Sequence, residues 1–260
     1  MMITEHESSI SKITPDEKLL HILLCNGSWY QLQVYKSLIQ YTAHKNGYLT
    51  SFLEYQNGRE AFFSKDDWIV DLDIVFIGWE HKGIKGIDIA RFFLKDIFKP
   101  QIIFFGIQAK NILASYEVNP LYFFSEDKLT FVNFEIIMKK CFQKVCKIKK
   151  ESLPFIRDGK KQRVLLELVV YIRVDHRLIT INCRDNHEIL IYGSLKNIEE
   201  NIHDETFMRV HRGFIVNLKY VDYVDKNELY LTTSESIPIA RKYKQELIQR
   251  MLEQSNNIMI

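Results

Sequence analysis

The chain has 260 residues, of which 47% are hydrophobic and 26% are charged, and its formal net charge at pH 7 is +2. This size and composition predict two folded domains and exclude a chain that is disordered over long stretches. The first residues lack the regions of a secretory signal, and no apolar run is long enough to cross a membrane. We therefore expect a soluble, cytoplasmic protein.

The first half of the chain alternates short apolar runs with longer amphipathic segments. This alternation is typical of a parallel sheet covered by helices, and five units of this size predict a flavodoxin-like α/β domain. Buried strands are predicted at residues 21–25, 48–53, 73–77, 101–105 and 121–124.

Helices are predicted between these strands, and a last one runs from about residue 131 to residue 149. Two of the helices have apolar residues at helical spacing, which indicates a buried face. The predicted stripes are Trp29, Leu32, Tyr35, Leu38, Ile39 and Thr42 in one helix, and Ile87, Ala90, Phe93, Leu94 and Ile97 in another.

The second half changes to an alternating pattern after a basic and polar connection at residues 146–152. Asp158 and Gly159 predict a tight hairpin turn between two strands. The sequence therefore predicts a small, mostly β domain. Its further strands are predicted at residues 169–174, 178–183, 188–193, 221–224 and 228–233, and its helices only at 194–202 and 241–253.

Net charge is weak evidence for a nucleic-acid partner. Residues 1–145 contain 16 Lys and Arg against 17 Asp and Glu, and the remaining residues contain 19 against 16. The positions of the basic residues are therefore more informative than their number. Two basic pairs lie at the edges of β-rich runs: His211-Arg212 within FMRVHRGFIVN, which starts at residue 207, and Arg241-Lys242 within IPIARKYKQEL, which starts at residue 237.

These two phrases resemble the C-terminal LytTR DNA-binding module of bacterial response regulators, in which F-x-x-x-H-R-x-x-x-V-N and a later I-P-x-x-R-x-Y recur. The resemblance implies a β-rich DNA-binding domain over residues 152–254, with base-reading positions at His176, Arg212 and Arg241. The guanidinium of an arginine matches the two acceptors of guanine in the major groove, and a histidine at a turn offers a donor or an acceptor. For all three residues, an ordinary solvated side chain is the alternative.

Other basic residues near these positions are candidates for phosphate contacts, which set affinity rather than sequence choice. The alternative for each is a solvated charge, and for His211 it is a structural hydrogen bond. Asn217 is predicted to satisfy backbone groups in a turn. The phosphate-contact candidates are His211, Lys242, Lys244, Arg209 and Arg177.

The first half resembles a response-regulator receiver over residues 17–145, most closely at DIVFIGWEHKGIKGIDIA, which starts at Asp73. The resemblance implies an aspartate that accepts a phosphoryl group and a Mg²⁺ site with hard oxygen ligands, but the matching positions lack these groups. We therefore predict a pseudo-receiver that is not switched by aspartyl phosphorylation. The phosphoacceptor falls on Gly78, the acidic pair on Asn26 and Gly27, the phosphoryl-sensing hydroxyl on Gly106, and the lysine-proline pair on Ser125-Glu126.

A neighbouring carboxylate is the alternative phosphoacceptor. Asp73 lies five residues before Gly78 in the same predicted strand, roughly 16 Å away at the rise of a strand. Glu80 is nearer, but it lacks the acidic pair that would position a metal ion. We expect neither residue to substitute.

No catalytic motif and no metal-ligand spacing competes with this interpretation. We therefore expect no enzymatic activity, no cofactor and no metal ion. The four cysteines form no CxxC pair. They are predicted to be reduced packing residues, with a redox switch as the alternative.

Together these patterns predict a transcription regulator that binds promoter direct repeats in double-stranded DNA as a homodimer, with half-sites roughly 10 bp apart. Without phosphorylation, its occupancy would depend on concentration, on receiver-mediated dimerisation or on a regulatory protein partner at the receiver. The rival hypothesis, from a different class, is an interaction protein that titrates a phosphorylatable relative or another partner through its receiver domain, with DNA contact incidental.

Overall fold

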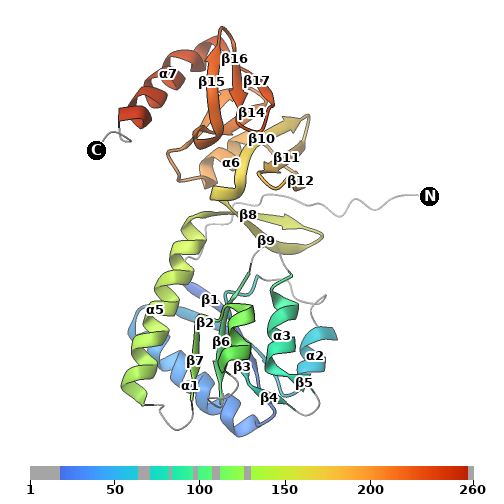
Figure 1. Ribbon diagram of the computed structural model, residues 1–260, viewed down its shortest axis with the longest axis vertical. Helices are drawn as coiled ribbons and strands as arrows, with labels where there is room; N and C mark the ends of the chain where they lie inside the picture. The colour runs from blue at the N-terminus through green and yellow to red at the C-terminus, as the bar shows by residue number, and fades with distance from the viewer. Residues whose placement is uncertain are drawn as a thin grey trace, which may run out of the picture. The chain divides into compact units, whose positions relative to one another are not determined.

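The structure is a computed structural model that describes residues 18–63, 71–81, 84–95, 99–106, 112–125 and 130–256. Its described residues form two compact units. Of the described residues, the receiver-like unit comprises those up to Lys150 and also Lys160–Arg163, and the β-rich unit comprises Glu151–Gly159 and those from Val164 onward. Each unit has its own sheet (Figure 1).

The receiver-like unit is built on a parallel sheet with the strand order β2-β1-β3-β6-β7. In sequence order of its own strands this is 2-1-3-4-5, the flavodoxin-like order. All five residues of β3 are buried, as expected for a strand covered on both faces. The five predicted strands are confirmed as β1 (Leu19–Cys25), β2 (Leu49–Tyr55), β3 (Ile74–Gly78), β6 (Gln101–Phe105) and β7 (Tyr122–Phe124).

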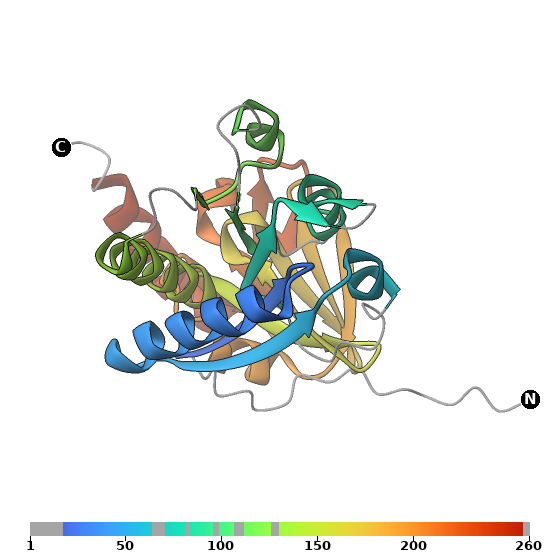
Figure 2. The ribbon, with the colours of Figure 1, turned by 90° about the horizontal axis from the view of Figure 1, so that it is seen from below.

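Helices cover both faces of this sheet. The long helices α1 and α5 lie side by side on one face (Figures 1 and 2), and α3 packs on the other. The helices are α1 (Trp29–Lys45), α2 (Gly58–Phe63), α3 (Gly86–Phe93), α4 (Ile112–Ser115) and α5 (Phe131–Lys150), with a 3-10 turn at Tyr116–Val118 and short strands β4 (Glu80–His81) and β5 (Ile84–Lys85).

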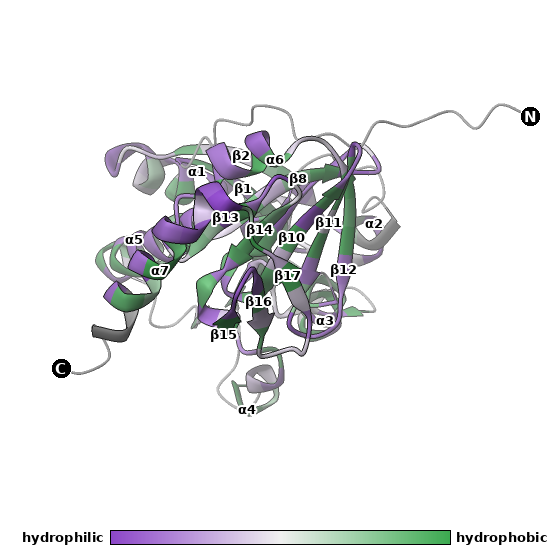
Figure 3. Ribbon diagram, turned by 90° about the horizontal axis from the view of Figure 1, so that it is seen from above, coloured by the Kyte–Doolittle hydropathy of each residue, from purple (hydrophilic) through white to green (hydrophobic). Residues whose placement is uncertain are grey.

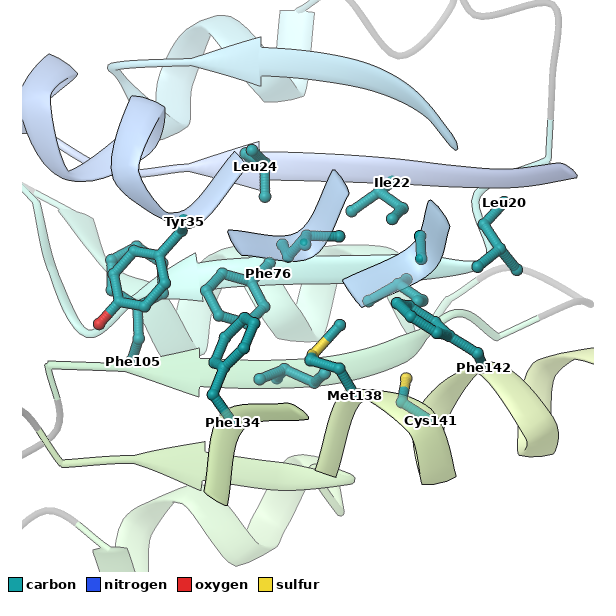
Figure 4. Close-up of a cluster of buried hydrophobic side chains, with 14 of the residues drawn as sticks. Leu20, Ile22, Leu24, Tyr35, Phe76, Phe105, Phe134, Met138, Cys141 and Phe142 are labelled. Carbon is teal, nitrogen blue, oxygen red and sulfur yellow. The ribbon is translucent and has the colours of Figure 1, made fainter. Parts of the chain in front are cut away.

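The core on the α1 and α5 face is rich in aromatic rings. Tyr35 of α1 lies 4.4 Å from Phe105 and 5.1 Å from Phe76 between ring centroids, and Phe134 of α5 packs beside them (Figure 4). Most of the predicted α1 stripe is buried, but its first member is not: Trp29 is 53% exposed. Trp29 was wrongly placed because it is the first residue of the helix, one turn before the helix meets the sheet.

The later stripe is confirmed over its first part. Ile87, Ala90 and Phe93 are buried in the core on the α3 face, and Leu94 packs against it. Ile97 lies outside the described residues.

The β-rich unit contains a five-stranded antiparallel sheet with the order β12-β11-β10-β14-β13 and a three-stranded sheet, β15-β16-β17. Strands β10 and β11 are largely hydrophobic (Figure 3). The unit's elements are β10 (Val169–Asp175), β11 (Leu178–Cys183), β12 (Glu188–Tyr192), α6 (Leu195–Asn201), β13 (Phe207–His211), β14 (Phe214–Asn217), β15 (Val221–Asp225), β16 (Glu228–Leu231), β17 (Ser236–Pro238) and α7 (Arg241–Asn256).

The predicted hairpin turn at Asp158 and Gly159 is confirmed. Both residues have positive φ, 53° and 72°, between strands β8 (Ser152–Arg157) and β9 (Lys160–Leu165). Two-residue turns with positive φ at both positions match the twist of antiparallel strands, and glycine adopts that conformation without strain.

The apolar residues of the phrase that starts at residue 207 belong to the core of the β-rich unit. Val210 and Val216 are fully buried, and Phe214 is partly buried against the same core. Asn217 is 1% exposed, and its side-chain amide donates to the carbonyl of Val169 at 3.0 Å. All four cysteines are free thiols, three of them buried. Among the described helices, none has the length and apolar content needed to span a bilayer.

Candidate nucleic-acid interface

The turn between β10 and β11 presents the first predicted base-reading residue. His176 has a φ of 53° in this turn, and its side chain is 96% exposed. The neighbouring Arg177 is also exposed, and its carbonyl accepts a hydrogen bond from the backbone of Gly193. The backbone of this turn is therefore anchored while both side chains point to solvent.

The turn between β13 and β14 presents the second predicted base-reading residue, Arg212. Strands β10 and β14 are antiparallel, with Arg173 opposite Phe214, and the amide of Val174 donates to the carbonyl of Gly213 at 3.0 Å. This register places the end of β10 beside the start of β14. Arg212, which is exposed, therefore leaves the same end of the sheet as His176.

Helix α7 begins at that end too. The amide of Ala240 donates to the carbonyl of Val210 at 2.9 Å, which joins the residue before α7 to strand β13 just ahead of its turn. Arg241, the first residue of α7, is exposed. We call this region, with His176, Arg212 and Arg241, the turn edge.

Two of the predicted phosphate contacts are used within the turn edge itself. The guanidinium of Arg209 donates to the carbonyl of Arg212 at 2.8 Å and to that of His211 at 3.3 Å, and it lies 3.4 Å from Glu199. The Nδ1 atom of His211 accepts from the amide of Gly213 at 3.2 Å. Both side chains therefore hold the shape of the turn that presents Arg212.

Besides Arg177, two further phosphate-contact candidates lie in the first turn of α7. Lys242 places its ammonium 4.4 Å from the ring centroid of Tyr243 and is exposed. The ammonium of Lys244 donates to the carbonyl of Lys226 and lies 3.4 Å from the amide oxygen of Asn227. Lys244 thus joins α7 to the turn between β15 and β16.

Lys226 was missed by the sequence analysis. It is exposed, with a φ of 47°, and the carbonyl of its neighbour Asn227 accepts from the amide of Ile239 at 2.7 Å, two residues before α7. The signal in the sequence is a Lys-Asn pair between two predicted strands, but only the register shows that this turn lies close to the start of α7.

One acidic side chain interrupts the positive charge of the turn edge. Asp175 is exposed and its carboxylate lies 3.8 Å from Nε2 of His176. A carboxylate at this place lowers the attraction for phosphates, which agrees with the modest net charge of this half of the chain.

The predicted phosphorylation positions meet at one edge of the receiver-like sheet. Cys25 is opposite Ile77, Gly78 is opposite Phe105, and Phe105 is opposite Phe124. The residues that end or follow these strands are therefore neighbours, and none of them is a carboxylate. They are Asn26, Gly78, Gly106 and Ser125; Gly27 is exposed beside them, and Glu126 lies outside the described residues.

The space for a side chain at Gly78 is already occupied. A Cβ atom at this position would lie 2.9 Å from the amide oxygen of Asn26 and 3.4 Å from the ring of Phe105. Asn26 is 5% exposed and its amide donates to Gln31 at 2.6 Å. The edge is thus closed by a neutral asparagine–glutamine pair at the place where the family resemblance implied a metal and a carboxylate.

Asp73, the first alternative phosphoacceptor, lies at the opposite end of the sheet. Its carboxylate is fully buried, 2.6 Å from the ammonium of Lys149, and it accepts from the amide of His21 at 2.8 Å. The side chain of Glu80, the second alternative, lies outside the described residues. Asp73 is therefore a structural partner of α5, a role that the sequence analysis did not predict.

A second buried carboxylate accompanies this pair. Burial raises the pKa of Asp71 to about 7, although Arg163, 3.4 Å away, opposes the shift. Burial likewise lowers the pKa of Lys149, against the opposing effect of Asp73. The amino end of the receiver-like sheet therefore holds a buried cluster of charges, and its carboxyl end holds the neutral pair.

Comparison with known proteins gives a family match for the β-rich unit. Residues 160–252 match the family model of the LytTr DNA-binding domain. The Sensory transduction protein LytT of Bacillus subtilis (strain 168) is 25% identical over 211 residues, which are 74% of this chain and 85% of that protein. The protein of the same name from Enterococcus faecalis (strain ATCC 700802 / V583) is 23% identical over 228 residues, 82% of this chain and 93% of that one.

Two solved structures align with parts of this chain. A LytTr DNA-binding domain from Bacillus cereus aligns with 39% of this chain and 96% of its own, with a TM-score of 0.34 and 20% identity. The response regulatory domain of protein mrkE from Klebsiella pneumoniae aligns with 49% of this chain and 99% of its own, with a TM-score of 0.43 and 11% identity. The chain is therefore similar to a LytTr DNA-binding domain over residues 160–252 and to Sensory transduction protein LytT over most of its length.

Proposed function

We propose that this chain is a transcription regulator that binds double-stranded DNA in a sequence-specific way, with a DNA-binding domain over residues 152–254 and a receiver domain over residues 17–145. The observation that carries the proposal is the turn edge. Three segments far apart in sequence, each with an exposed polar or basic side chain, are brought together within the part of the chain that matches a DNA-binding family.

The side chains of the turn edge take different roles. Arg212 and Arg241 read guanines through the guanidinium fork, and His176 reads a third position as a donor or an acceptor. Lys242, Arg177 and Lys226 neutralise phosphates around them. Arg209, His211 and Lys244 keep the turns in place, and their remaining donors add to the positive field.

The receiver acts without aspartyl phosphorylation. Support comes from the four strand-end positions, which lack a carboxylate, and from Asn26, which occupies the space beside Gly78. Exposure of the intact protein to acetyl phosphate should leave its mass unchanged. A stable added phosphate on the native chain would overturn this part of the proposal.

Regulation then depends on concentration, on dimerisation or on a protein that binds the receiver. A dimer that grips two direct repeats about one helical turn apart would place both DNA-binding domains on one face of the duplex. The role is regulatory rather than enzymatic.

The test is selection of bound fragments from a host genomic library near physiological salt, with untreated protein and no phosphodonor. Enrichment of a spaced repeat supports a phosphorylation-independent regulator. Binding that is lost with salt, without any enriched sequence, would favour the rival role of a partner-titrating protein, because phosphate contacts alone give salt-sensitive, non-specific binding. Arg212→Ala and Arg241→Ala serve as matched negative controls in the same selection.

A further inference from the structure

Helix α1 exposes an apolar face that no part of the described receiver-like unit covers. Tyr30 is 78% exposed, Tyr41 56% and Val34 39%. With Ser37, these residues follow one another at intervals of four, three and four along the helix. That spacing forms one stripe, and it is the spacing of a helix that packs lengthwise against another helix. We call these four residues the α1 face.

A shallow hollow of about 410 Å³ lies in this face, lined by Tyr30, Gln33, Val34, Ser37 and Leu38. The first four occupy positions i, i+3, i+4 and i+7 of one helix. Four residues at these positions form the hole that receives a side chain from a facing helix in knobs-into-holes packing. The small Ser37 leaves room at one corner, so the shape of the hollow suits a helix.

Apolar side chains of α5 extend the α1 face. The ring of Tyr41 lies 5.6 Å from that of Phe131, which begins α5 and is 44% exposed. Val132 and Ile136 of α5 are 64% and 50% exposed. Contiguous exposed apolar surface of this kind marks interaction sites in soluble proteins, because isolated apolar side chains are ordinary but grouped ones are not.

The charges around the face indicate which partner fits. Every residue of the α1 face and of the hollow is uncharged. Lys45, at the far end of the helix, is already paired with Glu135 at 2.6 Å. The α1 face itself therefore gives an oppositely charged partner nothing to recognise, but it can meet a copy of itself without repulsion. The exposed Lys139 and Lys140 follow Ile136 by one turn of α5 and lie outside the α1 face. An isologous dimer requires such self-complementarity, because the same patch faces itself across the two-fold axis.

We propose that the α1 face binds the α1 face of a second copy of this chain, with side chains of one helix entering the hollow of the other. This inference assigns a surface to the dimerisation in the proposed function. It rests on the proposed function only for the biological role of the dimer. Val34 lies at the centre of the face and therefore packs close to its counterpart in the partner.

The test uses Val34→Glu and Val34→Lys, examined singly and as an equimolar mixture by sedimentation of the full-length chain without DNA. We expect each variant alone to self-associate on the order of tenfold or more weakly than the parent, because like charges meet at the axis. The mixture should regain association, since each glutamate then faces a lysine. Leu113→Glu, at an 81% exposed apolar position of α4, is the control and should associate as the parent does.

Three outcomes would overturn the proposal: a parent that stays monomeric at all concentrations, single variants that associate as the parent does, or a mixture that stays as dissociated as its components. Far-UV circular dichroism and urea unfolding establish that the variants are folded, which is expected at a position already 39% exposed. Because the measurement contains no DNA, loss of sequence-specific binding elsewhere leaves its result intact, and the two proposals can fail separately.

Discussion

Each unit has a group of charged side chains, buried in the receiver-like unit and exposed in the β-rich unit. The receiver-like unit buries Asp73 and Lys149 as a pair, with side chains at most 1% exposed, at the amino end of its sheet. The β-rich unit exposes His176, Arg212 and Arg241 on turns at one end of its sheet. A buried charge needs a partner inside the protein, whereas an exposed charge on a rigid turn is available to a ligand. Charge therefore serves the fold in the first unit, and in the second it is available to a ligand, as the proposed recognition of DNA requires.

Replacing Asp73 should have the largest effect on stability, because it breaks the buried ion pair of the receiver-like unit. Asp73→Ala leaves the ammonium of Lys149 without its carboxylate and removes the acceptor for the amide of His21. Loss of one partner of a buried ion pair costs about 3–5 kcal/mol. The free energy of unfolding, measured by urea denaturation, should fall by that amount.

The control for this change is Asp88→Ala, which breaks a pair with Arg91 in which both side chains are nearly half exposed. Exposed pairs contribute about 0–1 kcal/mol. If the two variants unfold at the same urea concentration, the assignment of Asp73 as a buried structural charge is wrong.

Restoring a carboxylate at Gly78 tests whether the carboxyl end of the receiver-like sheet tolerates a charged side chain and can be phosphorylated. Gly78→Asp puts a charged side chain where a Cβ atom already lies 2.9 Å from Asn26. We expect a loss of about 1–3 kcal/mol in the free energy of unfolding from overpacking. We also expect no phosphorylation, since the acidic pair for Mg²⁺ is still absent. Mass spectrometry after acetyl phosphate treatment checks the second expectation, and an added phosphate would show that only the single carboxylate had been lost.

Removing an exposed arginine should leave the fold intact and weaken recognition. Arg212→Ala and Arg241→Ala should each weaken binding to the selected site by about 1–3 kcal/mol, while binding to unrelated DNA changes little. Titration of both DNAs at fixed salt measures this difference. Lys196→Ala, in α6, is the matched control, because its side chain is 79% exposed and it is no part of the turn edge. Unchanged binding of both arginine variants to the selected site would remove them as base readers.

Local patterns predicted the secondary structure well because each element repeats its own signal. Most strands of the receiver-like sheet are rich in apolar residues, and the Asp158-Gly159 hairpin has two residues that tolerate positive φ. Trp29 failed because periodicity alone does not show where along its length a helix meets the sheet. The motif phrases selected Arg212 and Arg241, and their exposure agrees with a surface role.

Contacts between distant residues could not be predicted in the same way. The turn edge depends on hydrogen bonds from Val174 to Gly213 and from Ala240 to Val210, each set by strand register rather than by local sequence. The pairing of Asp73 with Lys149 joins the start of a strand to the end of a helix 76 residues later. Lys226 entered the candidate interface only through such contacts.

Arg209 is neither fully buried nor fully exposed, since its side chain is 23% exposed. Its guanidinium donates to two carbonyls of the turn that presents Arg212. Hydrogen bonds of this kind contribute about 0.5–1.5 kcal/mol each, so Arg209→Ala should lower stability modestly. Its sharper consequence is in recognition: a loosened turn should weaken binding to the selected site more than to unrelated DNA.

Arg209→Lys keeps the positive charge but cannot reproduce the two-pronged geometry of the guanidinium. If Arg209 positions the turn, the lysine variant should resemble the alanine variant in its ratio of specific to non-specific affinity. If Arg209 contacts phosphate instead, the lysine variant should bind both DNAs as the parent does.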